Sequence, residues 1–309
     1  MEFIDPHFHV WDTLEIAKTG HSAKLLGGPG KEFPIYCTED YRVDFESVDG
    51  MVCKGCVYIE GISSVPLAEA MWASGECLNL VGETSVCDFR VVARCDLSDP
   101  DAKKRLRRLK SISGVVGVRQ IMSHHPSNPT LTWPLVERAD YMQDKDWLIG
   151  YAALGKLDLS FELQVNQHQL ADFVQVAQRY PNTNVVINHM GMLNMNESDA
   201  LDIWRKGMAA LAECKNVSVK ISFIDFAVPQ WYKDEKANEE VRGYIREVIV
   251  MFGSDRCMFA SNFPVDKYGG VTMDQLYSNY RKFVADLDEK SQYDLFYGTA
   301  ARFYKFDTE

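Results

Sequence analysis

Positive charge is scarce in this sequence. Its 309 residues include 33 Lys and Arg against 44 Asp and Glu, which gives a formal net charge of -11 at pH 7. Nucleic acids and anionic membrane surfaces attract proteins mainly through basic patches. The charge balance therefore predicts neither a nucleic-acid partner nor a membrane partner, and a small molecule is the expected ligand.

Long apolar runs are missing as well. No stretch approaches the roughly 20 apolar residues that are needed to span a bilayer. The first residues also lack the basic segment and apolar core that are typical of a signal peptide. These features lead us to expect a cytoplasmic protein.

The cysteines do not form a disulfide or zinc pattern. Eight of them are scattered along the chain, and CxxC spacing occurs once, at Cys53 and Cys56. Others, such as Cys95 and Cys257, lie inside apolar runs. This distribution is typical of reduced thiols in a protein core.

What the sequence does contain is an alternation of strand-like and helix-like segments. Eight such units in about 300 residues predict a closed (β/α)8 TIM barrel with parallel strands, formed by residues 1–309 as one domain. An open doubly wound sheet is the alternative, but it would usually carry a glycine-rich turn after the first strand. The predicted strands are residues 3–11, 55–60, 89–97, 115–121, 159–165, 184–191, 217–222 and 256–264. The predicted helices are residues 66–80, 102–111, 133–145, 167–180, 201–214, 238–252, 272–287 and 289–304.

The first strand is followed by a long irregular stretch, roughly residues 13–50. A loop of this length in a compact domain is usually functional, so we expect a lid or a wall of a binding site. His21 lies in this stretch, and we expect it at the surface.

Polar residues stand at the end of nearly every predicted strand. Burying them there is costly unless they have a partner or a purpose, and the carboxyl ends of barrel strands are where chemistry takes place. On the first strand, His7 and His9 point to the same face because side chains alternate, so they suit either one metal ion or one carbonyl oxygen. The other polar strand ends are Glu60, Asp96, Arg119, Gln164, His189, Lys220 with Ser222, and Asn262 with Asp266.

These residues, in this order, resemble the amidohydrolase-2 family, and within it the branch of sugar-lactone and pyrone-dicarboxylate lactonases. The resemblance covers about residues 3–304. The segments that carry it are His7-Phe8-His9, Arg119, Gln164, Asn188-His189-Met190-Gly191, Lys220-Ile221-Ser222, Met258-Phe259-Ala260-Ser261-Asn262-Phe263-Pro264-Val265 and Gly298-Thr299-Ala300-Ala301-Arg302-Phe303-Tyr304.

The resemblance implies a distorted (β/α)8 barrel that adds water to a carbonyl group. In the lactonase branch, histidines of strands one and six polarise the carbonyl, and an aspartate of strand eight is the general base. The matching histidines here are His7, His9 and His189, and Asn262 stands at the aspartate's position. The residues expected to bind substrate are Glu60, Arg119, Gln164 and Lys220.

Asn262 departs from the family pattern. A carboxamide cannot accept a proton at neutral pH, so another group must serve as the base. Asp266, Glu60, Asp5 and a histidine all remain candidates, and Asn262 would then orient water or donate a hydrogen bond.

The same substitution bears on metal binding. His7, His9 and His189 are the ligands expected if zinc binds, but the strand-eight carboxylate is missing and strand five offers Gln164 in place of histidine. Lactones can be opened without a metal when donors are preorganised around the carbonyl oxygen. We therefore predict a lactone hydrolase that requires no cofactor, acting on an acidic or polyhydroxylated substrate near Arg119 and Lys220.

Two other functions stay open: a metal-dependent hydrolase or non-oxidative decarboxylase of the same superfamily, and a barrel that only binds a ligand. The sequence gives no basis for an oligomeric state. We expect His124 and His125 to be exposed loop residues, His168 to lie on a helix, and residues 196–199 to form a helix cap.

Overall fold

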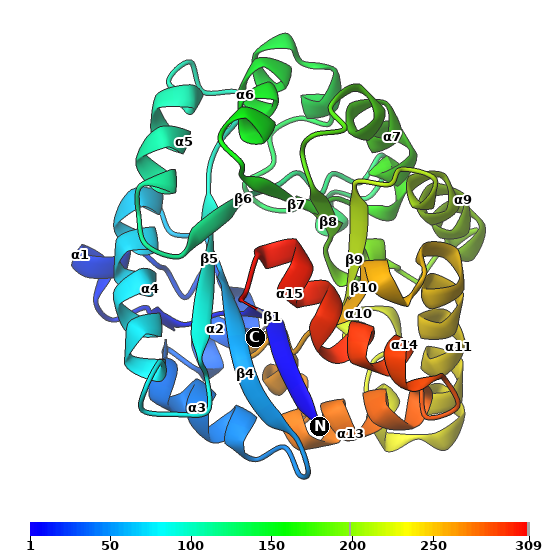
Figure 1. The fold of residues 1–309 in the computed structure, drawn as a ribbon. Helices are drawn as coiled ribbons and strands as arrows, with labels where there is room; N and C mark the ends of the chain where they lie inside the picture. Colours follow the sequence, from blue (N-terminus) through cyan, green and yellow to red (C-terminus); the bar gives the residue numbers. More distant parts are fainter. Residues whose placement is uncertain (198, 308–309) are drawn as a thin grey trace.

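A computed structural model describes residues 1–197 and 199–307, and its centre is a parallel sheet that nearly closes into a barrel. Strand order follows the chain throughout. This arrangement confirms the predicted (β/α)8 barrel (Figure 1). The strands are β1 (Glu2–Phe8), β4 (Val52–Ile59), β5 (Asp88–Arg94), β6 (Val115–Ile121), β7 (Ser160–Gln164), β8 (Val185–Ile187), β9 (Val217–Ile221) and β10 (Cys257–Phe259).

The segment just after the last strand meets the end of the first strand. Phe8 and Phe263 form a parallel bridge, and the His9 amide donates to the Phe263 carbonyl at 2.8 Å. The Asn262 amide donates to the His7 carbonyl at 2.7 Å. The seam of the barrel therefore places the two histidines beside Asn262.

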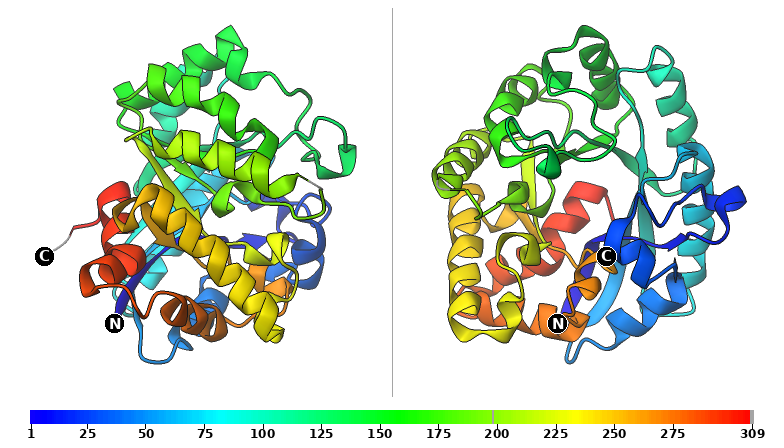
Figure 2. Two further views of the ribbon diagram at one scale, coloured as in Figure 1. Left: turned by 90° about the vertical axis from the view of Figure 1, so that its right-hand side faces the viewer. Right: turned by 180° about the vertical axis from the view of Figure 1, so that it is seen from behind.

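Amphipathic helices surround the sheet on the outside (Figures 1 and 2). In α7, for example, Leu170, Phe173 and Val176 are buried at the three-residue spacing that presents one apolar face. Among the described residues, no helix is both long enough and apolar enough to cross a membrane. The main outer helices are α3 (Thr38–Glu46), α4 (Pro66–Leu80), α5 (Ala102–Lys110), α6 (Lys145–Lys156), α7 (Leu170–Arg179), α9 (Ala200–Ala212), α11 (Glu235–Phe252) and α13 (Met273–Phe283).

The C-terminal helix α15 (Thr299–Tyr304) closes one end of the barrel. Its Ala300 and Tyr304 belong to a buried apolar cluster with Ile4, Val57 and Met258 from the strands. In the left view of Figure 2, this red helix lies at one end of the barrel and the dark-blue segment after β1 lies at the other. Catalytic groups are therefore expected at the end away from α15.

The stretch predicted as irregular, residues 13–50, contains helices, and that part of the prediction was wrong. It folds into α1 (Ile16–Thr19), α2 (Gly27–Glu32) and α3, with a short antiparallel pair of β2 (Trp11–Asp12) and β3 (Ile35–Tyr36). In α3, Tyr41 and Phe45 are buried four residues apart, and their rings meet edge to face. The first strand thus has its own helix, like the others.

The helix predicted over residues 133–145 was also wrong. That segment holds only a short 3-10 turn, Tyr141–Gln143, and helix α6 begins after it, at Lys145. The Asp144 carboxylate accepts the Trp147 amide at 2.7 Å and caps the helix. The helix predicted over 289–304 is instead α14 (Glu289–Tyr293), a π-helical turn and α15.

Candidate active site

A cavity of about 640 Å³ opens at the carboxyl ends of the strands. Seven of the nine predicted site residues line it, because their strands end at the same face. These seven are His9, Glu60, Arg119, Gln164, His189, Asn262 and Asp266. The other two, His7 and Lys220, are fully buried and lie next to the lining residues rather than in it.

A chain of hydrogen bonds fixes the protons on the first two histidines. His9 Nδ1 lies 2.8 Å from the Ile59 carbonyl oxygen, which can only accept, so Nδ1 carries a proton. His9 Nε2 lies 3.3 Å from His7 Nε2, and His7 Nδ1 lies 3.4 Å from Lys220 Nζ. The ammonium donates to His7 Nδ1, and His7 Nε2–H then donates to His9.

All three site histidines are held neutral. Burial lowers the pKa of His9 to about 3, and the charge of Arg119 adds to the effect. Burial, followed by the charge of Lys220, lowers the pKa of His7, and burial followed by Arg119 does the same for His189. His189 Nδ1 lies 2.9 Å from the hydroxyl of Ser222. Its other nitrogen, Nε2, is left for a ligand in the cavity.

The two predicted substrate-binding cations already have acidic partners. Arg119 donates from Nε to the Glu60 carboxylate at 2.7 Å, from NH2 to the Glu60 carbonyl at 2.6 Å, and from NH1 to Gln164 at 2.9 Å. Lys220 pairs with Glu162 at 2.7 Å, both side chains having no exposed surface. Burial lowers the pKa of Lys220 to about 8. Glu60 and Gln164 therefore hold Arg119, and Lys220 lies beneath the site.

Asp266 is a buried carboxylate in the cavity lining. Its Oδ2 accepts a hydrogen bond from Asn262 Nδ2 at 2.6 Å, while its Oδ1 is buried without a partner among the described residues. Burial raises the pKa of Asp266 well above the ordinary value, and the hydrogen bond from Asn262 opposes that rise. Asn262 adopts φ 56°, a left-handed conformation that asparagine tolerates well.

The other carboxylates considered as bases are occupied. Asp5 accepts from the Ser261 amide at 2.9 Å, from the Ser261 hydroxyl at 2.6 Å and from the Tyr41 hydroxyl at 2.8 Å, and it does not line the cavity. Glu60 is paired with Arg119 and also accepts the Ile62 amide at 2.7 Å.

Most of the cavity wall is apolar, and sequence reasoning missed it. These residues come from the ends of different strands and from the connections that follow them, so no local pattern in the sequence groups them. Asp225, a half-buried acid on the same wall, was missed as well. The large apolar lining residues are Trp11, Leu25, Leu26, Ile62, Ile121, Leu131, Trp133, Phe223, Phe226, Val265 and Tyr268.

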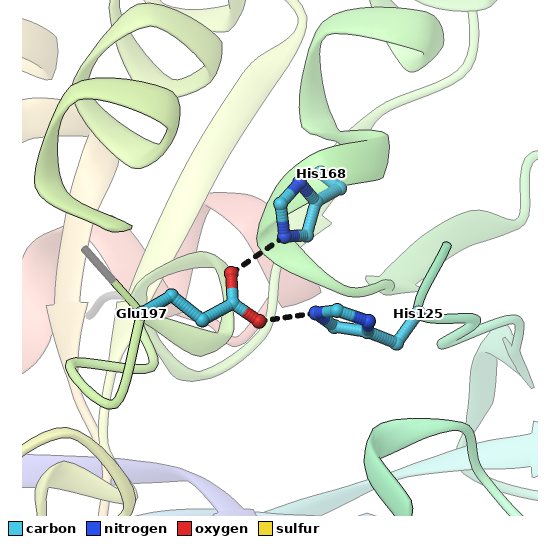
Figure 3. A group of neighbouring side chains, drawn as sticks. All are labelled: His125, His168 and Glu197. Carbon is cyan, nitrogen blue, oxygen red and sulfur yellow. Dashed lines mark hydrogen bonds and ion pairs between the residues drawn. The ribbon is translucent and has the colours of Figure 1, made fainter. Parts of the chain in front are cut away.

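A second polar cluster lies outside the cavity lining, where Glu197 bridges His125 and His168 (Figure 3). One carboxylate oxygen meets His125 Nε2, and the other lies 2.7 Å from His168 Nε2. Their ligand atoms lie within 4.8 Å of one another, close enough to hold one metal ion. His168 lies on a 3-10 turn, Gln167–Gln169, before α7.

Hydrogen bonds to Nδ1 of His125 determine which nitrogen of this ring carries the proton. The Asn128 amide donates to His125 Nδ1 at 2.8 Å, and the Ser127 amide does so at 3.2 Å. His125 Nδ1 is therefore an acceptor, Nε2 carries the proton, and the proton points at Glu197. A metal at Nε2 would need the proton on Nδ1, where the two amide donors point. As it stands, this cluster is a hydrogen-bonded bridge between two loops and a 3-10 turn.

Several predictions about loop residues were wrong. His125 is 6% exposed rather than a surface residue, and His124 is half-buried. Within the predicted cap of residues 196–199, Glu197 belongs to the bridge, whereas Asp199 does stand at the N-cap position of α9; Ser198 lies outside the described residues. His21 is fully buried, with Nε2 2.9 Å from Glu69. His21 and His125 can be buried because each pairs with a carboxylate that lies far away in the sequence.

The sequence matches the model of the amidohydrolase family over residues 4–306. The chain belongs to this family. Within the family it is 29% identical over 310 residues to the uncharacterized protein y4mH of Sinorhizobium fredii, covering 98% of each chain. It is 24% identical over 227 residues to an L-fucono-1,5-lactonase of Burkholderia ambifaria, covering 70% of each.

A crystal structure of an amidohydrolase from Burkholderia multivorans with bound zinc has the same fold. The TM-score is 0.79 at 21% identity, covering 99% of this chain and 100% of that one. The 3.3 Å between His7 Nε2 and His9 Nε2 would suit two nitrogen ligands of one tetrahedral zinc.

The surroundings of His7 in the present chain do not fit zinc, however. A histidine that binds metal through one nitrogen gives its other N–H to an acceptor. His7 Nδ1 instead faces the ammonium of Lys220, which is a donor. The carboxylate expected from strand eight is Asn262 here. The donor set at this position is therefore incomplete for zinc.

Proposed function

We propose that this amidohydrolase opens a lactone without a metal, with Asp266 as the general base for water. The observation that carries the proposal is the buried Asp266 carboxylate, which keeps one oxygen free in the same cavity as neutral His189. Asn262 holds the other oxygen at 2.6 Å and so orients the carboxylate.

Relative basicity favours Asp266 over the other candidates. The pKa of His9 is lowered to about 3, so this ring is a poor base at neutral pH. The pKa of Asp266 is raised above the ordinary carboxyl value, which makes its anion a stronger proton acceptor. Asn262 has no basic site and serves to position Asp266.

Two groups supply hydrogen-bond donors for the carbonyl oxygen. When the Ser222 hydroxyl donates to His189 Nδ1, His189 Nε2–H points into the cavity. Arg119 has five N–H groups, and the three bonds to Glu60 and Gln164 leave one N–H on each terminal nitrogen. Donors fixed in advance stabilise the negative oxygen of a tetrahedral intermediate.

The reaction balances with these groups alone. Asp266 takes a proton from a water molecule while the oxygen of that water attacks the carbonyl carbon of the lactone. The electron pair of the carbonyl bond moves to the carbonyl oxygen, which lies near His189 and Arg119. Collapse of this intermediate re-forms the carbonyl and breaks the ring carbon–oxygen bond. The leaving alkoxide takes the proton from Asp266, which releases a hydroxy acid. Lys220 positions His7 and takes no part in proton transfer.

The ring ester is the expected substrate because it needs less activation than an amide. A lactonase among the relatives supports this choice. The test is proton release on a panel of lactones by purified protein whose metal content has been measured, with and without a chelator. Turnover that resists the chelator and is lost in Asp266→Asn is expected.

Two results would overturn the proposal. Activity that disappears with the chelator and returns with zinc would assign a metal-dependent enzyme of this family. A broad panel with no turnover, together with tight binding of one ligand, would assign a binding protein.

A further inference from the structure

We propose that the substrate is an uncharged lactone with an apolar substituent, rather than a dicarboxylate or a sugar acid. This inference rests on the proposed lactonase function and names its substrate class. It replaces the acidic substrate expected from the sequence, because the structure shows what the two cations there are bonded to.

The charges around the cavity do not favour an anion. Arg119 is neutralised by Glu60 at 2.7 Å. Lys220, bonded to Glu162, does not reach the cavity wall. The lining also carries the acids Asp225 and Asp266. A substrate carboxylate would lose its hydration here and find no unpaired buried cation among the described lining residues.

Only the mouth of the cavity offers a free positive charge. Among the described lining residues, the one other cation is Lys24, which is exposed. A charge in contact with water contributes little to affinity. Lys24 therefore gives a weak preference for anions at most, and its contribution can be measured separately.

The shape and chemistry of the wall suit an apolar group. Trp133 and Leu131 come from the loop after β6, and Phe223 and Phe226 come from the turn after β9. Phe223 and Phe226 stack with their ring centroids 5.4 Å apart. At about 640 Å³ the cavity is larger than a bare lactone ring requires. Apolar substituents would fill the remaining volume.

The experiment uses two series of lactones with the intact protein. The first series lengthens an alkyl chain on one lactone ring, and kcat/KM is expected to rise about fourfold for each methylene until the cavity is full. The second series compares matched lactones that carry a methyl ester or a carboxylate, and the neutral member is expected to react at least tenfold faster.

Three variants test which side chains produce the preference for apolar and uncharged lactones. Trp133→Ala should reduce the rise in kcat/KM for each added methylene. It should reduce kcat/KM for the unsubstituted lactone to a smaller extent. Tyr293→Ala, an exposed aromatic outside the cavity lining, is the matched control and should keep the gain. Lys24→Ala should leave the preference for the neutral member intact.

The outcomes distinguish the two proposals. A carboxylate lactone or a sugar lactone that reacts faster than its apolar counterpart would overturn the substrate class while leaving the lactonase standing. A kcat/KM that does not change with chain length would also overturn it. Failure of every lactone would refute the proposed function itself.

Discussion

The hydrogen bond from Asn262 to Asp266 makes the sharpest prediction, through the pH dependence of turnover. Asp266 must be ionised to act as the base, so kcat/KM should rise with pH as this carboxyl loses its proton. Burial raises its pKa, and the Asn262 amide, by stabilising the anion, lowers it. Removing the amide should therefore raise the pKa and move the ascending limb to higher pH.

The size of the shift follows from the geometry. The N–O distance of 2.6 Å is short, as in a charge-assisted hydrogen bond. Such a bond to a charged group contributes about 1.5–3 kcal/mol. Because one pKa unit corresponds to about 1.36 kcal/mol, the limb should move up by about one to two pH units in Asn262→Gly. Water entering the space would place the shift near the lower figure.

Glycine is the right replacement because Asn262 has φ 56°, which alanine would adopt with strain. The assay is kcat/KM by titration of the released acid, corrected for spontaneous hydrolysis at each pH. In Asp266→Asn, the enzyme-dependent limb should vanish. A limb in Asn262→Gly that stays in place or moves to lower pH would refute the assignment of Asp266 as the base.

The remaining predictions concern single groups of the site and its surroundings. Asp266→Asn should lower kcat about 10²–10⁴-fold while thermal denaturation shows no loss of stability, because the buried carboxyl is costly when ionised. Lys220→Met leaves the Glu162 charge unpaired and should lower the free energy of unfolding by about 3–5 kcal/mol in urea; an unchanged value would mean that the pair is not buried as described. Glu197→Ala leaves the His125 Nε2–H without its acceptor and should cost about 1–3 kcal/mol by the same measurement. Its zinc content should equal that of the unchanged protein, and a loss of bound zinc would show that this cluster holds a metal.

The barrel and the strand ends could be predicted because each follows from a local rule. Apolar segments separated by amphipathic helices indicate parallel strands. A charge such as Arg119 at the end of a buried strand indicates a site, since burial without a partner is costly. Strand bounds could not be predicted where the backbone bends. The strand predicted over residues 184–191 ends at Ile187, because His189 and Met190 have positive φ values.

The pairings could not be predicted because they join residues that are far apart in the chain. Arg119 and Glu60 are separated by 59 residues, and His125 and Glu197 by 72. Before these contacts are known, Arg119 looks like a free anion-binding group. The sequence therefore favoured an acidic substrate, whereas the contacts of Arg119 underlie the proposal of an uncharged one.

The replacement at position 262 and the lysine beneath His7 are physically compatible with each other. A metal ion would supply positive charge to the carbonyl oxygen and would need a carboxylate ligand to offset its own charge. Here Arg119 supplies fixed N–H donors, while burial, together with the charges of Lys220 and Arg119, keeps the site histidines neutral. A strand-eight carboxylate is then not needed as a ligand. With Asn262 in its place, that position can donate a hydrogen bond to Asp266, and the base is set one helical turn further along the chain. We infer that Asn262 and the lysine beneath His7 belong to the same metal-free arrangement. In it, side chains stabilise the carbonyl oxygen, as a metal ion would otherwise do.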